Sequence, residues 1–211
     1  MSPIRIGTAR RILPILGLSL LSMTACDSST EPAGDATIRV QLTDAPSDML
    51  DSARVWISKV YLQGGAEGDD EPGRVYLFEA QDGDEARSFD LLRLRDGVVA
   101  DLAEATVEPR AYAQLRLVVD SSRIWLAEGF EMEDGATTAS LRIPSGSSSG
   151  IKVQLERPLD AESEATELIV VDFDVDEAFT FQNVGPTGVV RQVRFSPVLR
   201  EWGRGTEGSD R

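Results

Sequence analysis

The chain has 211 residues, a formal net charge of -15 at pH 7 and no histidine. Its basic residues are scattered singly among more numerous acids, so it lacks the basic face that binds phosphate, and we exclude nucleic acid as a partner. The absence of histidine excludes a Ser-His-Asp triad and an imidazole base, which leaves hydroxyls, carboxylates and two lysines as reactive groups.

The first 25 residues carry a basic segment and a short apolar run. Arg5, Arg10 and Arg11 are followed by about a dozen mostly apolar residues, too few to span a membrane. The only cysteine, Cys26, comes directly after the small residue Ala25. This arrangement resembles a bacterial lipoprotein signal peptide. We therefore predict cleavage before Cys26, lipidation of Cys26, and anchoring to a membrane of the cell envelope, facing the periplasm or the exterior. Cleavage removes three arginines and no acid, which takes the formal charge from -15 to -18.

Polar segments flank the region that we expect to fold. Residues 26–36 (CDSSTEPAGDA) show no hydrophobic periodicity, so we predict a flexible tether behind the lipid. Residues 203–211 contain no apolar side chain and are predicted to form a disordered tail. The residues between them, 37–202, are expected to form one domain.

The expected domain shows the alternation of apolar and polar residues that is typical of β-strands. The predicted strands cover residues 37–43, 54–62, 75–78, 112–119, 123–127, 140–143, 151–155, 167–175 and 189–199. Residues 47–52 and 90–105 are predicted to form short helices or turns. We therefore predict an all-β fold, specifically a two-sheet antiparallel β-sandwich with short helical connections.

Five segments follow one another in a specific order. They are IRVQLTDAPSD (38–48), FDLLRLRDGV (89–98), IPSGSSSGIKV (143–153), DFDVD (172–176) and FSPVLR (195–200). Together they resemble a family of bacterial envelope domains that is described only as a domain of unknown function and often follows a lipoprotein signal. The resemblance covers about residues 38–200. It implies a transthyretin-like or starch-binding-like sandwich, and it brings no catalytic or binding residues.

Two tryptophans are predicted to point away from the core. In RVWI (54–57) and RIWL (123–126) the aliphatic residues face inward by alternation, which leaves Trp56 and Trp125 on the outer side. Exposed tryptophans offer a flat surface for a sugar ring or an apolar partner. We predict a binding platform here. The alternative is that a loop covers these side chains or that they pack at the sheet edge.

An acidic cluster is the second candidate site. Asp172, Asp174 and Asp176 alternate with apolar residues, so a strand would project all three carboxylates from one face, about 7 Å apart. Such a group can converge on calcium. The alternative is a solvated outer face, or caps and turns at the end of the strand. Two carboxyl groups could instead act as the acid and the base of a glycosidase. The chain has 36 acidic residues, however, and their spacing in the sequence does not single out one pair.

These features favour a non-catalytic, lipid-anchored domain that binds or scaffolds a glycan or a surface protein. Two alternatives stay open: a carboxylate-dependent hydrolase of envelope polysaccharide, and a calcium-stabilised structural module. We predict no cofactor, apart from the calcium of the second alternative. The segment GSSSG (146–150) matches the nucleophile-elbow pattern, but the required histidine is missing, so we expect a hairpin loop there.

Overall fold

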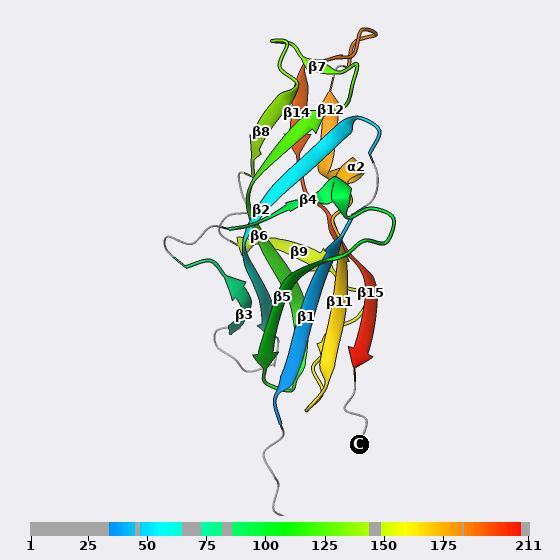
Figure 1. Cartoon of the computed structure of the whole chain (residues 1–211). Helices are drawn as coiled ribbons and strands as arrows, with labels where there is room; N and C mark the ends of the chain where they lie inside the picture. The colour runs from blue at the N-terminus through cyan, green and yellow to red at the C-terminus, as the bar shows by residue number, and fades with distance from the viewer. Residues whose placement is uncertain are drawn as a thin grey trace, which may run out of the picture. The chain divides into compact units, whose positions relative to one another are not determined.

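The computed structural model describes residues 34–44, 47–64, 73–81, 86–143, 149–182 and 184–207. All of them belong to one unit of the chain, Pro32–Arg211 (Figure 1). The predicted signal peptide, Cys26 and the tether up to residue 33 lie outside the described residues.

The described residues are mostly β-strand, which confirms the all-β prediction. The strands are β1 (Ala36–Thr43), β2 (Leu50–Gly64), β3 (Arg74–Glu79), β4 (Arg87–Asp90), β5 (Ala100–Val107), β6 (Ala111–Leu126), β7 (Glu131–Met132), β8 (Thr138–Arg142), β9 (Ile151–Gln154), β10 (Leu159–Asp160), β11 (Thr166–Asp172), β12 (Phe179–Gln182), β13 (Val189–Val190), β14 (Gln192–Phe195) and β15 (Leu199–Glu207). Two helical elements have described bounds: a 3-10 turn, η1 (Leu91–Arg93), and α2 (Val175–Ala178). Neither of them is long and apolar enough to cross a membrane.

Most of the described strands join in one large sheet of eleven strands. Its main path runs β3-β2-β6-β9-β15-β11-β1-β5, while β4 pairs with β2, and β8 and β10 pair with β6. Figure 1 shows β5, β1, β11 and β15 side by side. Most neighbours are antiparallel, but β1 runs parallel to β11 and β9 runs parallel to β15. The main sheet is therefore mixed and barrel-like, and the prediction of two antiparallel sheets is wrong. Alternation reveals the buried side of a strand but not the direction of its neighbour.

Alternating aliphatic side chains build the core. Ile38, Val40 and Leu42 of β1 and Val55 and Ile57 of β2 have no exposed surface. Burying one such side chain contributes roughly 1.5–3 kcal/mol. A slip of one residue would turn all of them toward solvent, so the core fixes the register of these strands.

The boundary predicted after residue 202 is wrong. β15 continues to Glu207 and pairs with β11 in an antiparallel arrangement. The second half of β15 has no apolar side chain to bury, so hydrophobicity gives no sign of it. Arg204 holds this half in place instead, through hydrogen bonds to Glu201 and to the carbonyl oxygens of Arg157 and Pro158. Residues 208–211 lie outside the described part of the chain.

The other predicted boundaries shift by a few residues. Ala36, placed in the tether by the sequence, is buried and begins β1, and the Asp35 carbonyl accepts a hydrogen bond from the Glu164 N–H at 3.0 Å. Within residues 90–105 only η1 is helical, and β5 begins at Ala100. Residues 47–49 precede β2, which begins at Leu50, so no helix forms at 47–52.

Candidate functional site

Strands β2 and β6 each have one buried and one outward side. Val55, Ile57 and Ile124 are fully buried, whereas Trp56 and Trp125 are partly exposed. The alternation predicted for RVWI and RIWL is therefore confirmed. Binding of a ligand by the two tryptophans stays a prediction.

The pairing of β2 with β6 places two arginines between the two tryptophans. Three cross-strand pairs form this surface, which we call the tryptophan–arginine face: Ser52 with Trp125, Arg54 with Arg123, and Trp56 with Ser121. Residues directly opposite each other in an antiparallel pair share one side of the sheet. The two tryptophans are offset by four strand positions, or about 13 Å along the strands.

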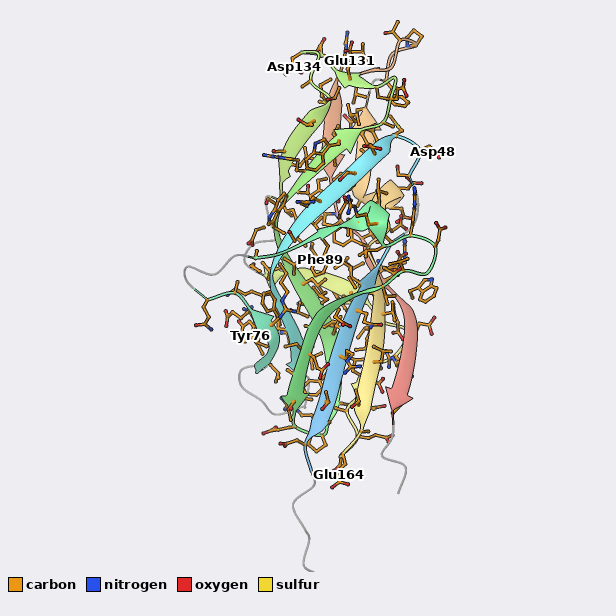
Figure 2. All side chains as sticks on the ribbon, viewed as in Figure 1. Asp48, Tyr76, Phe89, Glu131, Asp134 and Glu164 are labelled. Carbon is orange, nitrogen blue, oxygen red and sulfur yellow. The ribbon has the colours of Figure 1, made fainter. Side chains whose placement is uncertain are left out.

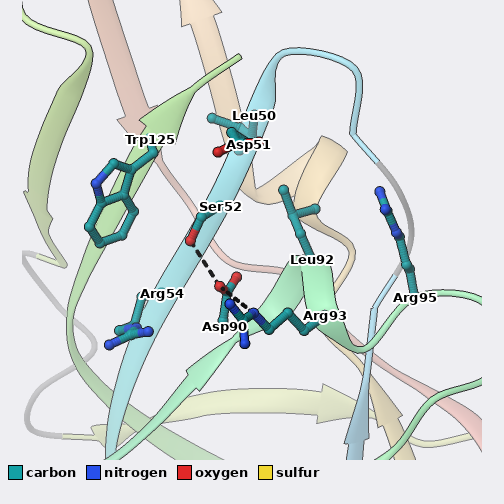
Figure 3. A pocket seen from close by; sticks show the side chains of 9 residues that line it. All are labelled: Leu50, Asp51, Ser52, Arg54, Asp90, Leu92, Arg93, Arg95 and Trp125. Atoms are coloured by element: carbon teal, nitrogen blue, oxygen red, sulfur yellow. Dashed lines mark hydrogen bonds and ion pairs between the residues drawn. The ribbon is translucent and has the colours of Figure 1, made fainter. Parts of the chain in front are cut away.

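A pocket of about 560 Å³ opens at the Trp125 end of this face (Figure 3). Asp51 lies in the wall of the pocket and forms a β-bulge. Leu50 and Ser52 pair with adjacent residues of β6, so Asp51 has no pairing residue on that strand. Bulges re-aim side chains and are common beside functional sites. We call this cavity the Asp90 pocket. It is lined by Leu50, Asp51, Ser52, Arg54, Asp90, Leu92, Arg93, Arg95 and Trp125.

Asp90 lies in the middle of this pocket, where β4 ends and η1 begins (Figure 3). Its side chain is 12% exposed. Oδ2 accepts a hydrogen bond from Ser52 Oγ at 3.0 Å and lies 3.4 Å from Arg93 Nε. Oδ1 is buried and has no hydrogen-bond partner among the described residues. A buried oxygen of this kind carries a desolvation penalty, so Asp90 brings an unsatisfied acceptor into the wall of the pocket.

The lining of the Asp90 pocket is basic although the chain is acidic. Three arginines and two aspartates line it, which gives the lining a formal charge of +1 in a chain of -15. The side chain of Arg54 forms no hydrogen bond or ion pair within the described ranges. Many acids lie at exposed positions elsewhere, such as Asp48, Glu131 and Asp134 (Figure 2). The pocket therefore concentrates hydrogen-bond donors that suit hydroxyl or anionic groups of a ligand.

The three aspartates of the predicted calcium site do not share a strand face. β11 ends at Asp172, and Asp174 caps α2 by accepting from the Glu177 N–H at 3.1 Å. Arg200 pairs with Asp174 and, at 2.6 Å, with Glu177, while Asp176 is exposed on α2. Across the described residues, no group of three or more Asp, Glu, His or Cys side chains is placed to hold a metal. The strand prediction fails here because Asp174 adopts a positive φ of 29°, which ends the extended chain.

The motifs behind the family resemblance meet beside α2. The Thr43 hydroxyl lies 3.0 Å from the Leu94 carbonyl oxygen and 3.1 Å from that of Val98. The buried Asp44 carboxylate accepts from the Val175 N–H at 3.1 Å. These contacts join LTDAP to FDLLRLRDGV and to DFDVD, so polar residues of the motifs hold the fold together.

Burial also affects the acid at the end of β11. Burial is the main cause that raises the pKa of the Asp172 carboxyl above its ordinary 3.8. A hydrogen bond from the Asp174 N–H, at 3.4 Å, partly opposes this rise. Asp172 is therefore a partly desolvated acid that terminates a strand.

The sequence pointed to Trp125 but not to the rest of the Asp90 pocket. Arg54, Asp90 and Arg93 come from β2, β4 and η1, and only the pairing of β4 with β2 brings them together. The sequence contains one indication of this site. In FDLL (89–92), Asp90 lies among apolar residues, which is typical of a partly buried acid.

One protein family matches the chain, over residues 35–187, under the description "Domain of unknown function (DUF4382)". The match covers more than half of the chain, so the chain belongs to this family. All residues of the Asp90 pocket lie within the matched range. No curated protein matches the chain. No solved structure matches it either, and the likeness to transthyretin-like or starch-binding-like folds stays a prediction.

Proposed function

We propose that this protein is a non-catalytic, lipid-anchored domain of the cell envelope that binds a glycan in the Asp90 pocket. The unpartnered Oδ1 of Asp90, in the same pocket as the indole of Trp125, is the observation that carries the proposal. A sugar suits both features, because its ring packs an apolar face on an aromatic side chain while its hydroxyls donate hydrogen bonds.

A glycan is favoured over a surface protein, the other partner considered. The volume of about 560 Å³ falls within the roughly 300–1,000 Å³ typical of pockets for small ligands. Stable protein interfaces bury a much larger, flatter surface with an apolar centre. The lining here is instead rich in charged side chains.

Binding is also favoured over the hydrolase and the calcium module. A glycosidase needs two carboxyl groups, one as acid and one as base or nucleophile. In the Asp90 pocket one of the two aspartates, Asp90, is already bound to Ser52 and Arg93. The calcium module is disfavoured because Arg200 pairs with the Asp174 carboxylate that such an ion would need.

Replacing Trp125 with alanine should weaken glycan binding by at least about tenfold, because the sugar loses its stacking surface. The measurement is isothermal titration calorimetry of the purified full-length protein with neutral and acidic oligosaccharides of bacterial envelopes. Trp202→Ala is the matched control, because that indole is 63% exposed and does not line the pocket. Unchanged binding by Trp125→Ala, or an equal loss in both variants, would place the glycan elsewhere.

The proposed anchor predicts that Cys26→Ala releases the protein from membranes or leaves an unprocessed precursor. Two acyl chains hold a protein stably at a membrane, so a variant that cannot receive them should lose this attachment. Cell fractionation with mass spectrometry of the N-terminus provides the measurement. Membrane retention of a correctly cleaved, unlipidated Cys26→Ala protein would rule out the lipid anchor.

A further inference from the structure

The centre of the tryptophan–arginine face holds two like charges side by side. Arg54 and Arg123 are directly opposed on antiparallel strands, so their β-carbons lie about 5 Å apart. Like charges in this position destabilise a sheet. An anion between them would remove the repulsion.

Neither arginine is neutralised within the described part of the chain. The Arg54 side chain has no hydrogen bond or ion pair there, and Arg123 donates from Nε to the neutral Ser140 hydroxyl at 3.1 Å. Asp90 is the cross-strand neighbour of Arg54 on β4, but its carboxylate bonds with Ser52 and Arg93 instead. The pair therefore keeps donors for an external anion.

We infer that the glycan bound here carries a carboxylate, which docks between Arg54 and Arg123 while a sugar ring packs on Trp125. This inference rests on the proposed function and adds the charge of the ligand to it. Guanidinium groups bind carboxylates through paired N–H donors. The ligand class is therefore a hexuronate-containing oligosaccharide. A singly charged carboxylate suits the site better than a phosphate, because Asp51 and Asp90 of the pocket lining repel a doubly charged anion more strongly.

The test compares oligogalacturonate and oligomannuronate with their methyl esters, in which a methyl group removes the charge of each carboxyl group. Titration calorimetry of the full-length protein at low salt should show at least about tenfold tighter binding of the acids than of the esters. Arg54→Gln and Arg123→Gln should each remove most of this preference. Arg191→Gln should keep it, because Arg191 is an exposed arginine outside both the face and the Asp90 pocket.

The outcomes separate this inference from the proposed function. If the protein bound acid and ester with equal affinity, and Trp125→Ala weakened the binding of both, the inference of a carboxylate would be wrong. The proposal that a glycan binds in the Asp90 pocket would be retained. Tighter binding of glucose 6-phosphate than of galacturonate would also overturn the inference of a carboxylate. Failure of every neutral and acidic glycan to bind would overturn both. The thermal melt of Arg54→Gln should match that of the wild type or lie slightly above it, because this side chain is exposed and its replacement removes the repulsion from Arg123.

Discussion

Replacing Arg204 with alanine should lower the free energy of unfolding by about 3–5 kcal/mol. Its side chain is 7% exposed and lies beside the carboxylates of Glu167 and Glu201, each 6% exposed. It donates to both carboxylate oxygens of Glu201, at 2.9 and 2.7 Å, and its Nε lies 3.5 Å from Glu167 Oε1. The variant leaves two buried carboxylates without their cation, which costs far more than the loss of a surface ion pair.

Urea-induced unfolding followed by circular dichroism measures this effect. Arg157→Ala is the matched control, because its side chain is exposed and it should change stability by less than about 0.5 kcal/mol. Arg204→Lys should recover only part of the loss, since an ammonium does not reproduce the forked guanidinium contacts. A loss below about 1 kcal/mol in Arg204→Ala would mean that backbone pairing with β11 alone holds the end of β15.

Replacing Phe173 with alanine should also cost about 3–5 kcal/mol, because the ring has no exposed surface. It stacks on Phe195 with ring centroids 6.3 Å apart, and Phe195 stacks in turn on Phe179 at 4.6 Å. These rings join the end of β11 to β12 and β14. The Phe173 N–H also donates to the Thr43 carbonyl at 3.1 Å, so the cavity would open beside the motif contacts.

Phe173→Leu is the comparison that separates packing volume from the aromatic contacts. It keeps most of the side-chain volume and should cost less than about 1.5 kcal/mol. Chemical unfolding of both variants gives the two values. If Phe173→Ala cost no more than Phe173→Leu, the site would have collapsed around the smaller side chain, and the ring cluster would not hold these strands together.

Hydrophobic alternation located most strands and the outward side of two of them. The predicted strand at 37–43 corresponds to β1, and RVWI and RIWL lie in β2 and β6 with both tryptophans away from the core. These predictions succeed because each strand has a fully buried side, which leaves a period of two in the sequence.

The residues that make up the candidate site depend on strand pairing, which alternation does not contain. Arg54 meets Arg123 only because β2 pairs with β6 in one register, and Asp90 reaches Ser52 only because β4 joins the other edge of β2. A shift of two residues would preserve the buried pattern and separate these side chains. Spacing along the chain therefore identified single residues but not the pocket.

The two clearest errors involve polar residues that stabilise the fold through specific bonds. Asp174 ends a strand by capping α2, and Arg204 orders a strand that has almost nothing apolar to bury. The sequence placed Asp174 on an outward strand face and Arg204 in a disordered tail, because charged side chains are usually exposed. A charged side chain that stabilises the fold differs from a solvated one only in its bonding partners. Those partners are either distant in the sequence or evident only from the backbone conformation.

Proton–nitrogen correlation NMR of the three tryptophan indoles tests the location of the glycan site most directly. Trp56, Trp125 and Trp202 each contribute one indole N–H signal, which substitution of each residue in turn assigns. Titration of the full-length protein with the tightest-binding oligosaccharide should shift the Trp125 signal most and leave the Trp202 signal unchanged. A shift of Trp202 alone, or no shift of Trp125 at saturation, would contradict a glycan site in the Asp90 pocket.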